Sequence, residues 1–206
     1  MNTLRHTPNI ASKAEKPRNT RRALLLGLGA ATLLPMLQGC FPVVATGVGA
    51  GAALVSDRRT SGTYVEDEGI EWKVSSRIRE RFGNTAHVNV TSYNRNVLLT
   101  GEAPNDTVRG ELDGIVAGVE HVRGVINEVV VGPNSALTAR GNDTLITSNV
   151  KARCVDAGRF SAHNVKVVTE ANVVFLMGIV TRAEADAAAE VARTSQGARK
   201  VVRVFE

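Results

Sequence analysis

Val88-Asn89-Val90 and Val97-Leu98-Leu99-Thr100-Gly101 decide the fold, because both segments recur 77 residues later. The second copies read Val165-Lys166-Val167 and Val174-Phe175-Leu176-Met177-Gly178. The residues before them repeat at an offset of 76, so that Asp67, Ile70 and Val74 match Asp143, Ile146 and Val150. A single long-period repeat of this kind indicates two copies of one structural unit.

Each copy begins with a helical pattern and continues as two strands. Apolar residues at i, i+4 and i+8 form one stripe per helix: Ile70, Val74 and Ile78 in the first copy, and Ile146, Val150 and Cys154 in the second. Residues 87–91 and 164–168 then alternate as half-buried strands do, and residues 96–100 and 173–177 are nearly all apolar. Turn-forming residues between them predict a hairpin in each copy.

A second helix and a last strand complete each unit. Asn105 is the expected N-cap of a helix over residues 107–118, and Thr181, with Glu184 three residues on, has capping-box spacing before residues 182–194. Residues 125–131 and 200–205 form the last strands. The predicted fold is therefore α+β: two tandem αββαβ units, each a three-stranded mixed sheet packed by two helices.

The segment before the repeats has the features of an export signal. Arg18, Arg21 and Arg22 precede an apolar run over residues 23–37, which is shorter than the roughly 20 residues of a membrane-spanning helix. Leu37-Gln38-Gly39-Cys40 then matches a lipoprotein cleavage site, in which Cys40 receives the lipid; a plain secretory signal followed by a chance cysteine is the alternative. Both the general and the twin-arginine export routes stay open.

This organisation divides the chain into five parts. They are a signal peptide over 1–39, a lipidated N-terminus and flexible tether over 40–66, a first repeat over 67–133, a linker over 134–142 and a second repeat over 143–206.

Removing the leader changes the charge of the protein. Six of the 25 basic residues and one of the 20 acidic residues precede Cys40, so the mature chain has 19 of each. The net charge of +5 is thus a property of the leader and gives no reason to expect nucleic-acid binding. Residues 67–133 contain seven bases and ten acids, whereas residues 134–206 contain ten bases and seven acids. The second repeat is the basic one.

No pattern in the sequence indicates catalysis, a metal, a cofactor or a small-molecule substrate. The histidines His6, His87, His121 and His163 are isolated in sequence from other metal-ligating residues at a usual spacing. Once Cys40 is acylated, Cys154 has no disulfide partner, and its place in an apolar stripe predicts a small buried side chain. Gly-x-Ser-x-Gly is absent. We therefore expect a protein that is not an enzyme.

The order helix, Val-x-Val strand, Val-x-Leu-x-Gly strand, helix and Val-x-x-Val strand resembles the BON domain of bacterial envelope proteins. Two such units behind Leu37-Gln38-Gly39-Cys40 are similar to the dual-BON-domain lipoproteins of that family. The resemblance implies an outer-membrane lipoprotein on the periplasmic face that is needed for envelope integrity. It also implies recognition of anionic phospholipid by the second BON domain and an association with the β-barrel assembly machinery.

The residues themselves offer a candidate lipid-contacting surface in the second repeat. With Ile146 and Val150 buried, Leu145 points about 140° away from Val150 and should be exposed. We predict that an exposed leucine with bases around it contacts headgroups, and the predicted contacts are Leu145, Arg140, Lys151, Arg153 and Arg159. In the family, an aromatic side chain can stand at the position of Leu145. Leucine lacks the interfacial preference of tryptophan, so we expect weaker membrane affinity here.

Two other interpretations remain beside this one. The acidic first repeat can instead dock a component of the β-barrel assembly machinery, which makes the protein a periplasmic interaction scaffold without direct lipid recognition. Leu145 is then an ordinary exposed leucine.

Trp72, the one tryptophan of the chain, lies about 160° from Val74 around its helix, and we expect it to pack against the linker or the other repeat.

Replacing Cys40 with Ser should abolish the lipid anchor, because serine offers no thiol for acylation. We expect the variant to lose palmitate labelling and to leave the outer-membrane fraction. Metabolic labelling with fractionation measures both. A variant that is still labelled and still sediments with the membrane contradicts the lipidation site.

Overall fold

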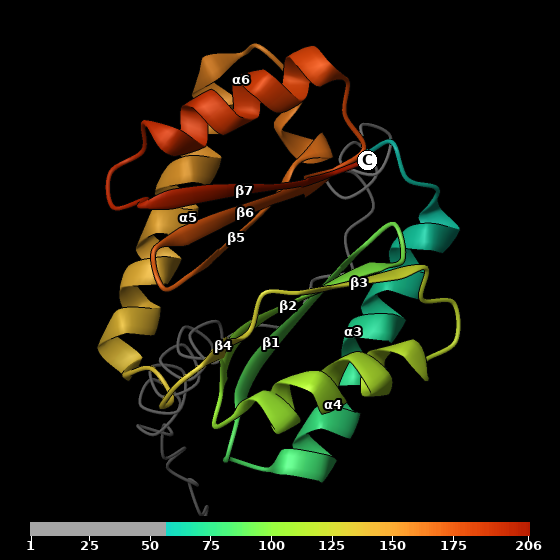
Figure 1. Ribbon diagram of the computed structural model, residues 1–206. Helices are drawn as coiled ribbons and strands as arrows, with labels where there is room; N and C mark the ends of the chain where they lie inside the picture. The colour runs from blue at the N-terminus through green and yellow to red at the C-terminus, as the bar shows by residue number, and fades with distance from the viewer. Residues whose placement is uncertain (1–56) are drawn as a thin grey trace, which may run out of the picture. The chain divides into compact units, whose positions relative to one another are not determined.

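The computed structural model of the protein describes residues 57–206, so the predicted leader, Cys40 and most of the predicted tether lie outside the described residues. The first repeat consists of α3 (Ser61–Phe82), β1 (His87–Tyr93), β2 (Asn96–Ala103), α4 (Asp106–Ala117), β3 (Gly124–Asn127) and β4 (Val130–Val131) (Figure 1). The second consists of α5 (Leu137–Ala157), the short 3₁₀ helix η2 (Ala162–Asn164), β5 (Lys166–Glu170), β6 (Val173–Gly178), α6 (Arg182–Arg193) and β7 (Lys200–Phe205). The predicted α+β class with two tandem units is confirmed.

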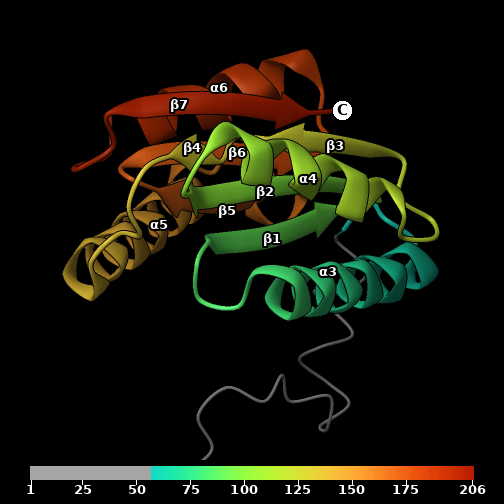
Figure 2. The same ribbon diagram turned by 60° about the horizontal axis from the view of Figure 1, so that its bottom comes forward.

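Both sheets share a three-strand order, and the first sheet has a fourth strand, because β4 also pairs parallel with β2. β1 pairs antiparallel with β2 and β2 pairs parallel with β3, while β5, β6 and β7 repeat this arrangement. In the first repeat α3 lies along β1, and α4 lies over β2 and β3 (Figure 2). The crossover through α4 or α6 is what allows the last strand to run parallel to the central one.

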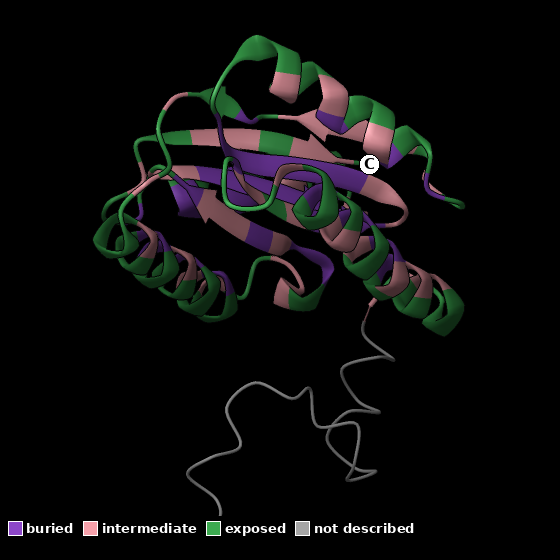
Figure 3. Cartoon of the chain, turned by 90° about the horizontal axis from the view of Figure 1, so that it is seen from below, coloured by how far each residue is buried: buried purple, intermediate pink, exposed green. Residues whose placement is uncertain are grey.

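The predicted apolar stripes form the core between helices and sheet. Ile70, Val74 and Ile78 pack with β2 and α4, and the corresponding residues of α5 pack with β6 and α6. Buried residues are concentrated on the strands and on one side of each helix (Figure 3). Cys154 is 2% exposed within this core, and its burial raises the pKa of its thiol.

The two sheets also pack against each other on the faces that the helices leave open. A third cluster joins Tyr93 and Leu98 of the first repeat to Phe175 and Met177 of the second. The central strands are therefore buried on both faces, with Leu99 turned to the helices and Leu98 to the other sheet. This second packing surface explains why residues 96–100 and 173–177 are apolar without alternation.

The glycine that ends the repeated Val-x-Leu-x-Gly motif makes room for the preceding strand. A Cβ at Gly101 would collide with the carbonyl oxygen of His87, and one at Gly178 would collide with that of Asn164. Gly101 also has a φ of +115°, a conformation that residues with a side chain rarely adopt. Close backbone approach therefore accounts for this part of the repeat.

A buried aspartate in the first helix of each repeat holds the hairpin turn. Asp67 accepts hydrogen bonds from the backbone N–H groups of Asn94 (2.8 Å) and Arg95 (2.7 Å). Asp143 accepts those of Ala171 (3.0 Å) and Asn172 (2.8 Å) in the same way. All four turn residues have positive φ, as a two-residue hairpin of the type I′ requires. This shared contact explains why Asp67 and Asp143 recur at equivalent positions.

Asp67 has two additional partners that Asp143 lacks. One is the Ser92 hydroxyl, which donates to it (2.7 Å), and the other is Arg59. Arg59 places Nη1 2.8 Å from Asp67 and stacks on the ring of Tyr93 at 4.0 Å. Burial opposes the charge of Arg59, but hydrogen bonds with Asp57 and Asp67 outweigh that effect and raise its pKa. In the first repeat Asp67 therefore joins α3 to the hairpin turn and also to Arg59, which precedes the helix.

Several element boundaries differ from the sequence-based prediction. α3 begins at Ser61, where the Thr60 side chain accepts the N–H of Thr63, and α5 begins at Leu137, inside the predicted linker. Gly141 does not end that helix, because one glycine costs a helix only about 1 kcal/mol. The last strand of the first repeat is interrupted, since the N–H of Val129 donates to the side chain of Asn127 (3.1 Å) instead of joining the ladder.

Within residues 57–206, no helix combines the length and the apolar character that crossing a membrane requires.

Asp67→Asn should destabilise the protein more than the matched Asp143→Asn. Both changes weaken two turn hydrogen bonds, at a cost of about 1–3 kcal/mol, and Asp67→Asn also removes a buried partner of Arg59, for a total of about 2–4 kcal/mol. Urea unfolding at pH 7 measures both variants. Equal losses in the two variants contradict a special role for the Arg59 pair.

Candidate functional site

The exposed face of α5 is the candidate site for contact with a lipid surface. Leu145 is 71% exposed, next to the buried Ile146. Leu137 and Val155, also exposed, lie about 80° around the helix from Leu145 and on one side of it. Between Leu137 and Val155 the one acidic residue is Asp143, which is buried against the hairpin turn. Between Leu137 and Val155 this face therefore exposes apolar side chains without a negative charge, while the exposed Asp156 places one at the C-terminal end of α5, about 20° around the helix from Leu145.

The five predicted contact residues do not form one cluster in the structure. Arg153 points to the end of α6, where it donates to the Val191 carbonyl (3.1 Å) and the Ser195 hydroxyl (2.8 Å). Arg159 forms an ion pair with Glu190 at 2.8 Å. Both bases bond inside the second repeat: Arg153 is held at the end of α6 by several hydrogen bonds, whereas Arg159 takes part in an exposed pair.

Arg140 and Lys151 lie on the other flank of α5. Arg140 is partly buried and donates to the Ser135 hydroxyl (3.0 Å), whereas Lys151 is exposed and forms no ion pair with any described residue. Both line a pocket of about 460 Å³ together with residues of β5. Lys151 is therefore the predicted cation that is best placed to meet an anion.

A turn from a distant part of the sequence, which bases flank, lies next to Leu145. Leu145 shares a small pocket with Gln196 and Gly197, in the turn between α6 and β7. Gly197 fits there because a Cβ would lie 2.8 Å from a side-chain carbon of Ile146. The exposed bases Arg193, Arg199 and Lys200 flank this turn. Sequence reasoning missed them because about 50 residues separate them from Leu145, and only the packing of α5 on α6 brings the turn to it.

Trp72 corrects one expectation. It is 72% exposed on α3, so it does not pack against the linker or the other repeat as predicted. Val65, 70% exposed, lies one heptad earlier and therefore on nearly the same side of the helix. The first helix of the first repeat thus also has an exposed apolar face.

The structure brings together one group of residues that could hold a metal ion. His87, Glu102 and Glu170 each place a ligand atom within 4.8 Å of the others. Sequence reasoning did not predict this group, because Glu170 belongs to the second repeat and approaches His87 and Glu102 only when the two sheets pack. His121 and His163 belong to no such group among the described residues.

Comparison with known proteins identifies related sequences over most of the chain. The family profile of the BON domain matches residues 66–133 and 142–206. The chain is similar to Outer membrane lipoprotein DolP of Haemophilus influenzae, with 38% identity over 186 residues that cover 89% of this chain and 94% of that protein. It is also similar to the 21 kDa hemolysin of Actinobacillus pleuropneumoniae, with 37% identity over 72% of this chain and 78% of that protein. Osmotically-inducible protein Y of Escherichia coli is 26% identical over 76% of this chain and 80% of its own length.

Reversing the charge of Arg153 should destabilise the second repeat, whereas reversing that of Arg159 should not. Arg153→Glu removes the hydrogen bonds to the end of α6 and turns a carboxylate toward the Val191 carbonyl, at a cost of about 1–3 kcal/mol. Arg159→Glu breaks an exposed pair, which contributes about 1 kcal/mol or less. Thermal and urea unfolding test the difference. Two equally stable variants would show that Arg153 is not a structural residue.

Proposed function

The chain belongs to the BON domain family and is an outer-membrane lipoprotein, and from this premise we propose that it maintains envelope integrity by binding anionic phospholipid through its second BON domain. The lipid on Cys40 holds the protein at the periplasmic face of the outer membrane. The second domain then recognises charged headgroups next to the anchor. The proposed activity is binding, without a chemical reaction.

The observation that carries this proposal is the exposure of Leu145 beside a turn that bears several bases. Inserting a leucine side chain into an apolar environment contributes about 1.5–3 kcal/mol. Each base near an anionic surface, here Lys151, Arg199 and Lys200, adds about 1 kcal/mol. The sum gives weak reversible binding, which suffices for a protein whose anchor keeps it at the membrane.

The other predicted contacts have a smaller part in the proposal. Arg140 is partly buried at the pocket that Lys151 lines, and Arg153 and Arg159 bond to α6 or its end. Their charges add to the positive potential of the second domain. Direct contact with phosphate is expected mainly from Lys151 and from the bases that flank the α6–β7 turn.

Vesicle flotation of the mature chain carrying Cys40→Ser tests the proposal without the anchor. We expect binding to vesicles with anionic phospholipid, none to neutral vesicles, and loss of binding as salt is raised. Leu145→Asp should weaken binding about tenfold or more, because it replaces an inserting side chain by a charge that the surface repels. Val65→Asp is the matched control, with the same substitution at equal exposure on the first helix of the other domain.

The basic residues have their own control, a charge reversal on the first domain. The double variant Arg199→Glu and Lys200→Glu should reduce binding to anionic vesicles, whereas Arg79→Glu, at an exposed base of α3 with no ion pair among the described residues, should leave it nearly unchanged. Absence of binding at low salt, or equal losses for Leu145→Asp and Val65→Asp, contradicts lipid recognition by the second domain.

The exposed face of α3 favours a second candidate function. Val65 and Trp72 form an apolar surface on the first domain, and exposed aromatic residues are enriched in protein interfaces. In this alternative the protein is a periplasmic scaffold that docks the β-barrel assembly machinery through that surface. It predicts that vesicle binding is absent and that Trp72→Ala abolishes cross-linking to the machinery in cells.

A further inference from the structure

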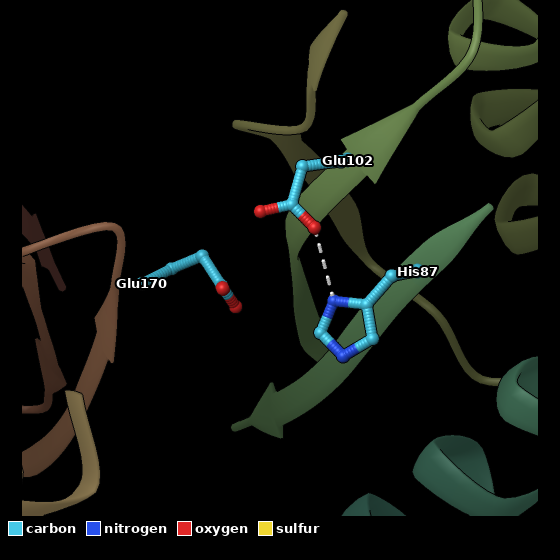
Figure 4. A group of neighbouring side chains, drawn as sticks. All are labelled: His87, Glu102 and Glu170. Atoms are coloured by element: carbon cyan, nitrogen blue, oxygen red, sulfur yellow. Dashed lines mark ion pairs between the residues drawn. The ribbon is translucent and has the colours of Figure 1, made fainter. Parts of the chain in front are cut away.

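A histidine and two glutamates meet where the two domains pack against each other. His87 begins β1 and faces Glu102 of β2, its direct partner in the antiparallel register. Glu170 ends β5 in the second domain, and its carboxylate points toward them (Figure 4). One ligand atom from each residue lies within 4.8 Å of the other two. Both domains are therefore needed to assemble this group.

The group contains two buried carboxylates, and His87 is the one basic side chain of the described residues that pairs with either of them. Glu102 and Glu170 are 6% and 7% exposed. Glu170 accepts hydrogen bonds from the neutral Asn89 amide (2.7 Å) and the Thr100 hydroxyl (3.3 Å), and Glu102 accepts the backbone N–H of Ser135 (3.1 Å). Among the described residues, no Lys or Arg lies within 4 Å of either carboxylate. Burying such charges without a cation is costly.

His87 adds an unsatisfied nitrogen to the same place. Its Nδ1 is 3.3 Å from an oxygen of Glu102, but the alignment does not make a hydrogen bond, and the atom is buried without another partner. A neutral imidazole and two carboxylates are the donor set that a divalent cation satisfies at once.

We propose that His87, Glu102 and Glu170 bind a divalent transition-metal ion, Zn²⁺ by preference, that links the two BON domains. Imidazole favours zinc over magnesium and calcium, which prefer sites made of oxygen alone. Zinc bonds of about 2.0–2.2 Å require donor atoms roughly 3.3 Å apart, which small side-chain rotations achieve from the present spacing. Two of the three ligands, His87 and Glu170, line the pocket of about 460 Å³, which provides an entry path and space for a water molecule as fourth ligand.

Such an ion would couple the stability of the two domains. Its ligands come from β1 and β2 on one side and from β5 on the other, next to the apolar contact of Leu98 with Phe175. Because the unfolded chain does not present this arrangement, zinc binding stabilises the packed domains by mass action. Leu145, which carries the proposed lipid contact, is not among the ligands, although Lys151 of α5 lines the same pocket as His87 and Glu170.

Zinc titration of the mature chain carrying Cys40→Ser, without an affinity tag and after treatment with chelator, tests the proposal. Isothermal titration calorimetry should show one Zn²⁺ per chain. Zinc at about 100 times its Kd should raise Tm by about 5–10 °C, whereas the same concentration of Mg²⁺ should not. Glu170→Gln and His87→Gln should each weaken binding at least tenfold. Glu128→Gln, at an exposed glutamate of the first domain with no side-chain hydrogen bond or ion pair among the described residues, should bind zinc as the parent does.

X-ray absorption of the zinc-loaded protein gives an answer that does not depend on the variants folding. The expected first shell contains nitrogen and oxygen at about 2.0–2.1 Å and no sulfur at about 2.3 Å, which excludes Cys154 as a ligand. Absence of saturable binding at 100 μM zinc, sulfur in the shell, or full affinity in Glu170→Gln overturns the proposal. Leu145→Asp should bind zinc normally, so failure of either proposal leaves the other intact.

Discussion

The packing of the two sheets against each other is the constraint on which the rest of the structure depends. Each sheet has one face covered by its own helices and another that would expose apolar residues such as Leu98 and Phe175 if the domains stood apart. Contact between these faces buries these residues. The middle strands β2 and β6 are then covered on both faces, by helices on one side and by the other sheet on the other. The fold therefore needs both copies, because a single unit would leave one apolar face of its sheet exposed to solvent.

Polar contacts around this apolar centre fix how the domains meet. Lys166 of β5 reaches Glu71 of α3 at 2.7 Å, and Arg58, just ahead of α3, bonds to Glu184 at the start of α6. The carboxylate of Glu206 accepts hydrogen bonds from the side-chain amides of Asn94 and Asn96. Apolar contact supplies most of the free energy, whereas these directional pairs select one relative orientation. The group of His87, Glu102 and Glu170 lies in the same border but lacks a lysine or arginine such as those that Glu71 and Glu184 contact.

The sequence was sufficient for features that depend on neighbouring residues and insufficient for those that depend on distant ones. Hydrophobic periodicity and turn residues predicted the helices, the hairpins and the caps at Asn105 and Thr181. The start of α5 was missed because Gly141 and Pro133 were read as a linker, although a glycine is tolerated inside a well-packed helix. Arg153 looked exposed on a helical wheel, but its length lets it reach the end of α6, which no periodicity within α5 reveals. The bases beside Leu145 and the approach of Glu170 to His87 follow from tertiary packing alone.

The two domains retain the same interior and differ on the outside of their first helices. At the repeat offset of 76, the buried Ile70 and Val74 correspond to Ile146 and Val150, whereas Leu145 corresponds to Gly69 and Trp72 to Ser148. The exposed apolar residues therefore stand at unequal positions on α3 and α5. Since exposed positions do not affect the core, substitutions there change what the surface binds at little cost in stability. Duplication of a unit that must pair with its copy thus leaves two outer helix faces free to acquire different partners, one beside an acidic domain and one beside a basic domain.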